Sequence, residues 1–295
     1  GYKKMDEIID SYTGKTYNIY ENQYALPIGY TYDATISRDY YDSLSALDKQ
    51  EALMQAAVTD LSVDNNVDGK LQFSDTSLDY QVIEDEGITW DQENHMLHVD
   101  SPDSKLKIEF NAIPNCETYV RFHNLNIDPN TEGHFAGKLE SDKVKSAMYF
   151  TASDYRWALD REDYMIHLGH ENDGKTVLEL TFERPGDIEL DDIAIHSVPM
   201  DSYVAQVTKL GAEAMTDVKV TDNKVTGKIK VSQDKILCFS MMNVNGWTLK
   251  VDGVATPLSE VNTMYMGTKI TKGAHTIELS YQTPGLKLGA TISAI

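Results

Sequence analysis

The feature that most limits the fold is a series of short alternating segments, each ended by a turn signal, in the last quarter of the chain. From Trp247 to Val251 every second residue is apolar, so one face of an extended strand would be buried and the other wet. Asp252-Gly253 follows and predicts a two-residue hairpin turn. His275 to Tyr281 repeats the alternation. These residues predict a half-buried antiparallel sheet.

The same pattern extends upstream and predicts a mainly β protein. Turn pairs such as Asp173-Gly174 and Pro185-Gly186 separate the segments, which favours sandwiches over a parallel α/β fold. The candidate strands of the middle region are His95–Val99, Leu106–Phe110, Thr118–Leu125, Val144–Phe150, Met165–Leu168, Val177–Phe182 and Ile188–His196. The expected domains are an α+β segment at 1–70, a jelly-roll-like β-sandwich at 71–198, a linking helix at 199–211 and a small Ig-like or fibronectin-like sandwich at 212–295.

The N-terminal segment carries a helix signal after two short strand-like runs, Tyr17 to Tyr20 and Ile28 to Tyr32. Ser45 and Asp48 fit a capping box, in which the Ser45 side chain accepts a hydrogen bond from the first turn. Apolar residues then recur at helical spacing as far as Val58 and Leu61. The pattern predicts a docked amphipathic helix of about 15 residues.

Charge excludes one class of partner. The chain has 26 basic and 47 acidic side chains and a net charge of -21, which repels phosphate backbones. We therefore expect no nucleic-acid partner, and a polyanionic wall polymer would need a basic patch, although no dense run of Lys or Arg is present. Cys116 and Cys238 lie far apart in sequence and predict buried thiols rather than a disulfide framework.

One stretch matches a metal-binding template. From Asp64 to Asp75 the residues fit the calcium-loop pattern D-x-[DN]-x-[DN]-G with an acid at the twelfth position. Oxygen ligands would come from Asp64, Asn66, Asp68, the Lys70 carbonyl and Asp75. The alternative is an acidic connector between a helix and a sheet, since no exiting helix and no second loop follow. Calcium is the one cofactor that the sequence suggests.

A second candidate site is the segment from Thr151 to Asp163. It combines aromatic, guanidinium and carboxylate groups, the mixture that holds a sugar by stacking and bidentate hydrogen bonds. The candidate glycan-binding residues are Tyr155, Arg156, Trp157, Asp160 and Arg161. The alternative is that Trp157 caps the sandwich core while the charged residues form surface ion pairs.

Motifs near both ends resemble the C-terminal extracytoplasmic region of the YfhO family. The family comprises polytopic bacterial membrane proteins related to GT-C glycosyltransferases, which use lipid-linked sugars. The matching residues are Tyr20 to Tyr30 with the Y-E-N-x-x-A-L-P pattern, Gln50 to Ala57, Gly246-Trp247, Lys250 to Gly253, Met266-Gly267, Lys272 to His275, Tyr281 and Pro284-Gly285. The resemblance implies a galactose-binding-like jelly roll, an excised ectodomain on the extracytoplasmic face of the cell membrane, and a truncated transmembrane helix beginning near Leu286.

Catalytic motifs are missing from the sequence. It contains no H-E-x-x-H, C-x-x-C, P-loop, G-x-S-x-G or G-x-G-x-x-G pattern. The resemblance places the catalytic carboxylate of such enzymes in the membrane part, so we expect a non-catalytic domain that assists glycosylation of a cell-envelope polymer such as a teichoic acid or polysaccharide. Its partners would be a glycan or lipid-linked sugar and the remainder of its own membrane domain. The alternatives are a carbohydrate-binding module and a purely structural ectodomain without ligand.

Overall fold

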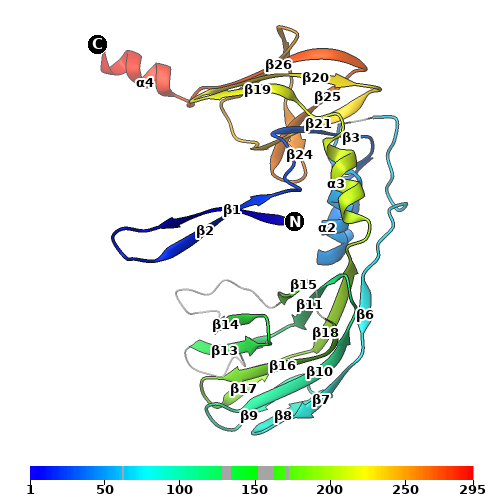
Figure 1. The fold of residues 1–295 in the computed structure, drawn as a ribbon, viewed down its shortest axis with the longest axis vertical. Coiled ribbons are helices and arrows are strands. Elements are labelled where there is room, and N and C mark those ends of the chain that lie inside the picture. The colour runs from blue at the N-terminus through cyan, green and yellow to red at the C-terminus, as the bar shows by residue number, and fades with distance from the viewer. Residues whose placement is uncertain (62, 128–133, 152–162, 171–172, 295) are drawn as a thin grey trace. The chain divides into compact units, whose positions relative to one another are not determined.

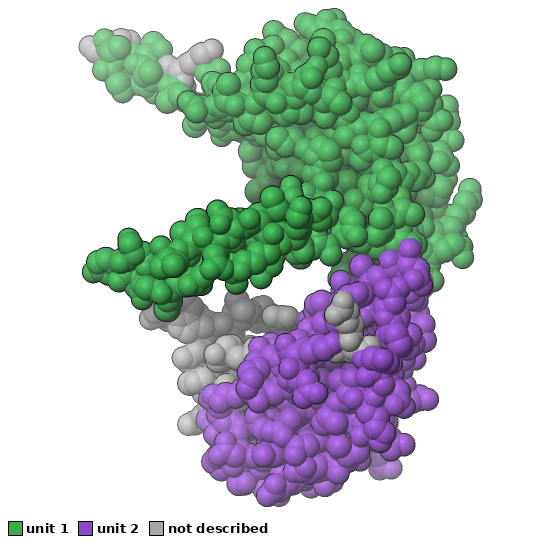
Figure 2. Space-filling view, in the orientation of Figure 1, with its two compact units in different colours: residues 1–73, 202–295 green, residues 74–201 purple. Residues whose placement is uncertain are grey.

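A computed structural model describes residues 1–61, 63–127, 134–151, 163–170 and 173–294. The chain forms two compact units, and the second is inserted in the sequence of the first (Figure 2). Unit 1 consists of Gly1–Phe73 and Ser202–Ile295, and unit 2 of Ser74–Asp201. Both are built mainly from antiparallel sheets, which confirms the prediction of a mainly β protein (Figure 1).

Unit 1 contains two sheets that face each other across one core. The five-stranded sheet has the order β19 (Thr216–Thr221), β20 (Lys224–Val231), β26 (Gly273–Tyr281), β22 (Trp247–Val251), β23 (Val254–Thr256). The four-stranded sheet has the order β24 (Ser259–Val261), β25 (Tyr265–Ile270), β21 (Lys235–Met242), β3 (Gly29–Tyr32). Apolar side chains from both sheets, including Phe239, Leu249, Met266 and Leu279, form a continuous buried cluster. The predicted alternation of β22 therefore serves this core.

The turn chemistry of this sheet follows the sequence. Asp252 and Gly253 both adopt positive φ, 53° and 80°, and join β22 to β23 as the Asp-Gly pair predicts. Gly246 also has positive φ, and an added Cβ would lie 2.5 Å from the Gln282 carbonyl oxygen. Trp247 packs on the core beside Tyr281, with ring centroids 5.1 Å apart.

Helices α2 (Ala46–Gln55) and α3 (Tyr203–Gly211) cover the other face of the four-stranded sheet. Unit 1 also contains α1 (Arg38–Ser43) and α4 (Leu286–Ser293). Along β21, Leu237 and Phe239 point into the core between the sheets, whereas Ile236 and Cys238 pack in a second cluster with Leu210 of α3. Because β3 pairs with β21, residues 1–73 belong to the same unit as the C-terminal sandwich, and not to a separate segment.

Helix α2 begins as predicted but ends early. The Ser45 hydroxyl accepts a hydrogen bond from the Asp48 N–H at 3.1 Å, which confirms the cap. The prediction that Val58 and Leu61 continue the helix is wrong, because the chain turns extended at Ala56. Val58 instead lies in β5 (Ala57–Val58), parallel to β4 (Thr35–Ile36), and its N–H is bound by the Asn262 side chain. Tertiary hydrogen bonds thus outweigh the helical pattern.

The described residues of unit 2 form three sheets. One has the order β14 (Lys145–Thr151), β13 (His134–Glu140), β16 (Gly174–Phe182), β10 (Lys105–Ala112), β7 (Tyr80–Glu84). The second has the order β15 (Tyr164–His170), β11 (Cys116–His123), β18 (Asp192–Pro199), β6 (Thr76–Leu78). The third has the order β12 (Asn126–Ile127), β17 (Gly186–Glu189), β9 (Met96–Val99), β8 (Ile88–Asp91). Assignment to a jelly roll stays a prediction.

The predicted strand from Ile188 to His196 is two strands in the structure. β17 pairs with β9, and β18 pairs with β11 in a different sheet. At the crossing, the Leu190 N–H donates to the His95 carbonyl and the Asp191 N–H to the His123 carbonyl, at 2.9 and 3.0 Å. The chain therefore passes from one sheet to another within a stretch whose apolar pattern is continuous.

The remaining elements bear on the membrane expectation. β1 (Tyr2–Ile9) and β2 (Thr16–Asn22) form a separate two-stranded sheet. Within the described residues, no helix is long and apolar enough to cross a membrane. α4 begins at Leu286, where the resemblance implies the start of a truncated transmembrane helix.

Candidate functional site

The predicted glycan-binding residues fall outside the described part of the chain. Tyr155, Arg156, Trp157, Asp160 and Arg161 all lie in the gap between residues 151 and 163. The glycan-binding role of this segment stays a prediction.

Asn66 and Asp68 of the calcium template accept hydrogen bonds from backbone N–H groups. Asp68 Oδ1 accepts from the Ser37 N–H at 2.8 Å, and Asn66 Oδ1 accepts from the Asp68 N–H at 3.1 Å. The Lys70 N–H donates to the Val67 carbonyl, and Gly69 has the positive φ that the sharp turn requires.

Asp75, the twelfth residue of the template, belongs to unit 2, where its carboxylate lies 3.2 Å from Nδ1 of His196. Across the described ranges, no group of three or more His, Cys, Asp or Glu side chains is arranged to hold a metal ion. Calcium binding by this loop stays a prediction, and the geometry gives Asn66 and Asp68 a structural role.

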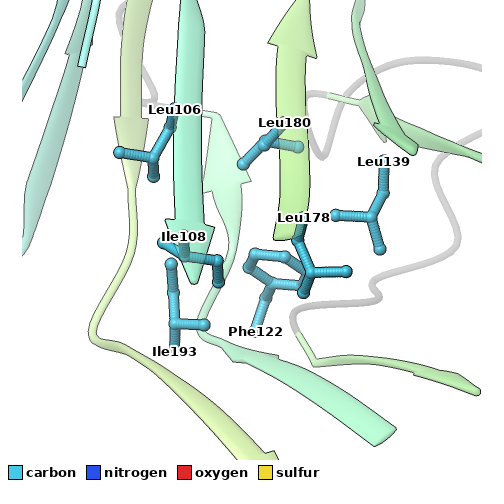
Figure 3. Close-up of a pocket in the computed structure, with 7 residues that line it drawn as sticks. All are labelled: Leu106, Ile108, Phe122, Leu139, Leu178, Leu180 and Ile193. Atoms are coloured by element: carbon cyan, nitrogen blue, oxygen red, sulfur yellow. The ribbon is translucent and has the colours of Figure 1, made fainter. Parts of the chain in front are cut away.

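The interior of unit 2 is packed solid. Figure 3 shows its centre, where side chains from the five-stranded sheet and from the sheet that contains β11 and β18 point toward one another. The lining residues are Leu106, Ile108, Phe122, Leu139, Leu178, Leu180 and Ile193. The space among them is too small for a water molecule, so this part of the core has no room for a ligand.

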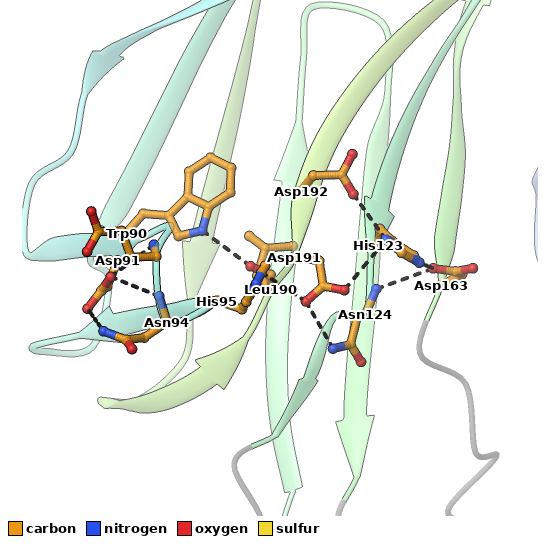
Figure 4. Close-up of polar contacts among 11 residues, drawn as sticks. Trp90, Asp91, Asn94, His95, His123, Asn124, Asp163, Leu190, Asp191 and Asp192 are labelled. Atoms are coloured by element: carbon orange, nitrogen blue, oxygen red, sulfur yellow. Dashed lines mark hydrogen bonds and ion pairs between the residues drawn. The ribbon is translucent and has the colours of Figure 1, made fainter.

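A polar cluster lies where the chain passes between the sheets of unit 2 (Figure 4). Asp191 lies 3.2 Å from Nδ1 of His95 and accepts a hydrogen bond from the Asn124 side chain, also at 3.2 Å. His123 lies 3.2 Å from Asp192 and 3.8 Å from Asp163. His95 and Asn124 have positive φ, 55° and 51°, so the carboxylates fasten two strained turns.

In this cluster the imidazole and amide groups contact carboxylates. The exposed fractions of these side chains run from 31% to 59%, which favours a surface junction over a desolvated reaction centre. We therefore interpret the cluster as the joint that holds β11, β18 and the turn before β9 together.

The five-stranded sheet of unit 1 carries an open groove of about 760 Å³ on its outer face. Backbone pairing places Lys219 beside Thr226, Thr226 beside Glu278, and Glu278 beside Lys250. One row of side chains therefore crosses β19, β20, β26 and β22. Lys228 and Thr276, also paired across strands, form the neighbouring row. Along β20, β22 and β26 the even-numbered side chains form this outer face, because the odd-numbered ones point into the core.

The groove is basic within a strongly acidic chain. Its lining contains Lys219, Lys228 and Lys250 against Asp217 and Glu278. Asp217 binds Lys228 at 2.9 Å, and the hydrogen bond from Lys228 lowers the pKa of that carboxyl. This carboxylate is therefore held ionised.

Glu278 binds Lys224 beside the groove at 2.8 Å, and that hydrogen bond lowers the Glu278 pKa. Lys219 and Lys250 are exposed, and each acts on a carboxylate of the groove: the charge of Lys219 helps to lower the Asp217 pKa, and that of Lys250 the Glu278 pKa. Both ammonium groups are open to solvent and can bind an anion, beside hydroxyl and carboxylate groups that can bind sugar hydroxyls.

Sequence reasoning missed this surface because its lysines come from three separate strands. No segment of the chain contains a dense basic run. The available signal was the alternation from Lys224 to Lys230, in which three lysines occupy outward positions of one strand. Only the strand order, which sequence did not provide, places Lys219 and Lys250 on the same face.

Comparison with known proteins connects the chain to one family. The family model described as "Bacterial membrane protein YfhO" matches residues 3–293. The protein described as "Uncharacterized protein YfhO" of Bacillus subtilis (strain 168) is 24% identical over 289 residues, which cover 95% of this chain. The chain spans 31% of that relative's length.

Similarity to solved structures is weak. Dimeric latent PorU from Porphyromonas gingivalis is 10% identical, with 69% of this chain and 20% of that chain covered and a TM-score of 0.25. An allantoicase structure is 11% identical, with 68% and 86% covered and a TM-score of 0.24.

Proposed function

This chain belongs to the YfhO family of bacterial membrane proteins, and on that premise we propose that it is a non-catalytic extracytoplasmic domain of a polytopic glycosyltransferase-like protein. In this role it holds an acidic cell-envelope polymer, such as a teichoic acid, while the membrane part transfers the sugar. The observation that carries the proposal is the basic groove on the five-stranded sheet of unit 1.

The charge pattern supports an anionic ligand. A chain with a net charge of -21 repels polyanions except where cations are concentrated. Lys219 and Lys250 lie in the same row, separated by three strand spacings or about 14 Å. They can therefore contact different repeats of one extended polymer, while Thr226 offers a hydroxyl group and Glu278 a carboxylate between them.

The same groove lacks the features of a glycosidase or transferase centre. A general acid needs a carboxyl with a raised pKa, next to a second carboxyl that stays ionised. Here the pKa of both Asp217 and Glu278 is lowered, each by hydrogen bonding to a lysine. Both carboxyls are therefore ionised at neutral pH, which favours binding over proton transfer.

The test measures binding of a purified polyol-phosphate polymer and a neutral polysaccharide to residues 1–295 by calorimetry at two salt concentrations. Lys219→Glu/Lys250→Glu should weaken polymer binding by at least about tenfold at low salt, since two cations become anions. Lys269→Glu/Lys272→Glu is the matched control, because it makes the same charge change away from the groove.

Equal weakening by both double variants would show that net charge, and not the groove, governs binding. If the neutral polysaccharide binds, and the groove variant binds it with the same affinity, a carbohydrate-binding module would be favoured. Absence of binding to every polymer would favour the structural ectodomain without ligand.

A further inference from the structure

The β1–β2 hairpin exposes large apolar side chains that no other described part of unit 1 covers. Every residue of both strands is exposed, and the sheet has no third strand (Figure 1). The exposed fractions are Tyr2 73%, Met5 54%, Ile8 54%, Ile9 66%, Tyr12 96%, Tyr17 53%, Ile19 40% and Tyr20 53%. An isolated two-stranded hairpin is only marginally stable in water, so we expect this one to be stabilised by contact with a partner.

The apolar residues lie on both faces of the hairpin and toward its turn. Ile8 pairs with Tyr17 on the face that also carries Ile19, whereas Ile9 pairs with Thr16 on the opposite face. Tyr12 stands at the turn between the strands. A flat protein surface would cover only one face of the hairpin. An apolar environment that surrounds the tip would cover both faces.

The distribution of charged residues along the hairpin indicates which end enters such an environment. Lys3, Lys4, Asp6 and Glu7 lie in the part of β1 away from the turn. From residue 8 to 17 the only charged side chains are Asp10 and Lys15, which cancel. The tip is thus an electroneutral, apolar end of a chain whose net charge is -21, and it complements a zwitterionic surface.

The turn itself is built to keep its shape. The Asp10 carboxylate accepts hydrogen bonds from the Tyr12 N–H at 2.8 Å and from the Thr13 hydroxyl at 2.5 Å. The Gly14 N–H donates to the Asp10 carbonyl, with Gly14 at φ 67°. Tyr12 is therefore displayed by a defined turn, and its side chain makes none of these bonds.

We propose that the tip of the β1–β2 hairpin inserts into the interfacial layer of a phospholipid bilayer. Tyrosine is enriched at this depth because its ring is apolar and its hydroxyl stays hydrated. Both strands have a free edge whose peptide groups would be unsatisfied in hydrocarbon, so the hairpin stops at the headgroups. This contact goes beyond polymer binding, because it uses a different part of unit 1 and a different partner.

The experiment places an environment-sensitive fluorophore on a single exposed cysteine of residues 1–295. Ser11→Cys labels the hairpin turn, and Asp222→Cys labels the turn between β19 and β20 as the matched control. Cys116 and Cys238 are buried and free, so labelling is confined to the introduced cysteine. The probe is a phosphatidylcholine vesicle, with and without a nitroxide at the headgroup end of the acyl chain.

The label at position 11 should shift to shorter wavelength on vesicles and be quenched by the shallow nitroxide, whereas the label at 222 should not change. Ile8→Ser/Ile9→Ser should weaken vesicle binding on the order of tenfold. Because that variant can also unfold the hairpin, Tyr12→Glu serves as a second one that retains every hydrogen bond of the turn.

A label at position 11 that stays water-like at saturating lipid would overturn the proposal. So would a spectral shift that grows with protein concentration in the absence of vesicles, since a second copy would then cover the hairpin. Polymer binding is measured separately, so either proposal can fail while the other stands.

Discussion

Lys235→Met tests how far one buried cation holds unit 1 together. Lys235 is 8% exposed, and its Nζ lies 2.7 Å from Asp33 and 2.8 Å from Glu213. These carboxylates come from the end of β3 and from the segment after α3, so one lysine joins three distant parts of the chain. Met replaces the aliphatic stem of the lysine and removes only its charge.

The expected cost follows from leaving Glu213 without its cation and Asp33 with only Lys209, whose Nζ lies 3.4 Å away. Removing one partner of a buried ion pair destabilises proteins by about 3–5 kcal/mol. The side chains of Asp33 and Glu213 retain 25% and 24% exposure, so water compensates for part of the loss. We expect a value near the low end, about 3 kcal/mol at pH 7.

The loss should depend on pH in a defined direction. Burial raises the pKa of Asp33 and Glu213, but hydrogen bonds and charge from Lys235 outweigh it, and both pKa values lie below normal. A lowered folded-state pKa contributes stability above the unfolded pKa, about 4, and this is lost as pH falls through the folded value. The gap between wild type and variant should therefore be largest near neutrality and shrink below about pH 4.

The assay is urea unfolding followed by Trp247 fluorescence, with Trp90 and Trp157 replaced by Phe so that only unit 1 reports. Lys269→Met is the control, because its pair with Asp234 on the neighbouring strand end is 41% and 48% exposed, and it should cost at most about 1 kcal/mol. A Lys235→Met loss no larger than the control's, or a gap that does not shrink between pH 7 and about pH 3, would refute the reasoning.

Two further predictions concern polar contacts in unit 1. Asn262→Ala should cost about 1–3 kcal/mol in urea unfolding, because the buried Val58 N–H and Tyr32 hydroxyl each lose a partner; a change below about 0.5 kcal/mol, the level of a surface substitution, would argue against it. The hydrogen bond to Asp252 raises the pKa of His275, so its contribution is full below the ordinary value of 6.5 and lost as pH rises through the folded value. His275→Gln should therefore destabilise more at about pH 6 than at about pH 9, and the opposite order would contradict this assignment.

Local patterns in the sequence predicted local structure well. Asp252-Gly253 specified a hairpin turn because both residues tolerate positive φ, and Ser45 specified a helix start because its hydroxyl caps the first turn. Val58 was misassigned since its N–H is bound by Asn262, about two hundred residues later in the chain. The periodicity of apolar residues depends on neighbours within one helix or strand, so it cannot indicate a hydrogen-bond partner that is distant in sequence.

The basic groove could not be predicted for a related reason. Lys219, Lys228 and Lys250 are ordinary strand residues in sequence, and strand order alone makes them neighbours. The calcium template carries a related ambiguity, because the same spacing of Asp and Asn occurs in turns whose side chains bind backbone N–H groups: Asn66 accepts from the Asp68 N–H and Asp68 from the Ser37 N–H. The glycan-binding residues from 155 to 161 stay as predicted from sequence.

The pairing of β3 with β21 has a consequence for synthesis. Tyr32 meets Ile236, so the first strand of the four-stranded sheet waits for about two hundred further residues before its partner is made. At typical elongation rates of about 5–20 residues per second, the wait lasts on the order of 10–40 s. All of unit 2 is synthesised within that interval, before β21 exists. The four-stranded sheet of unit 1 can therefore form only after the whole of the inserted unit has been made.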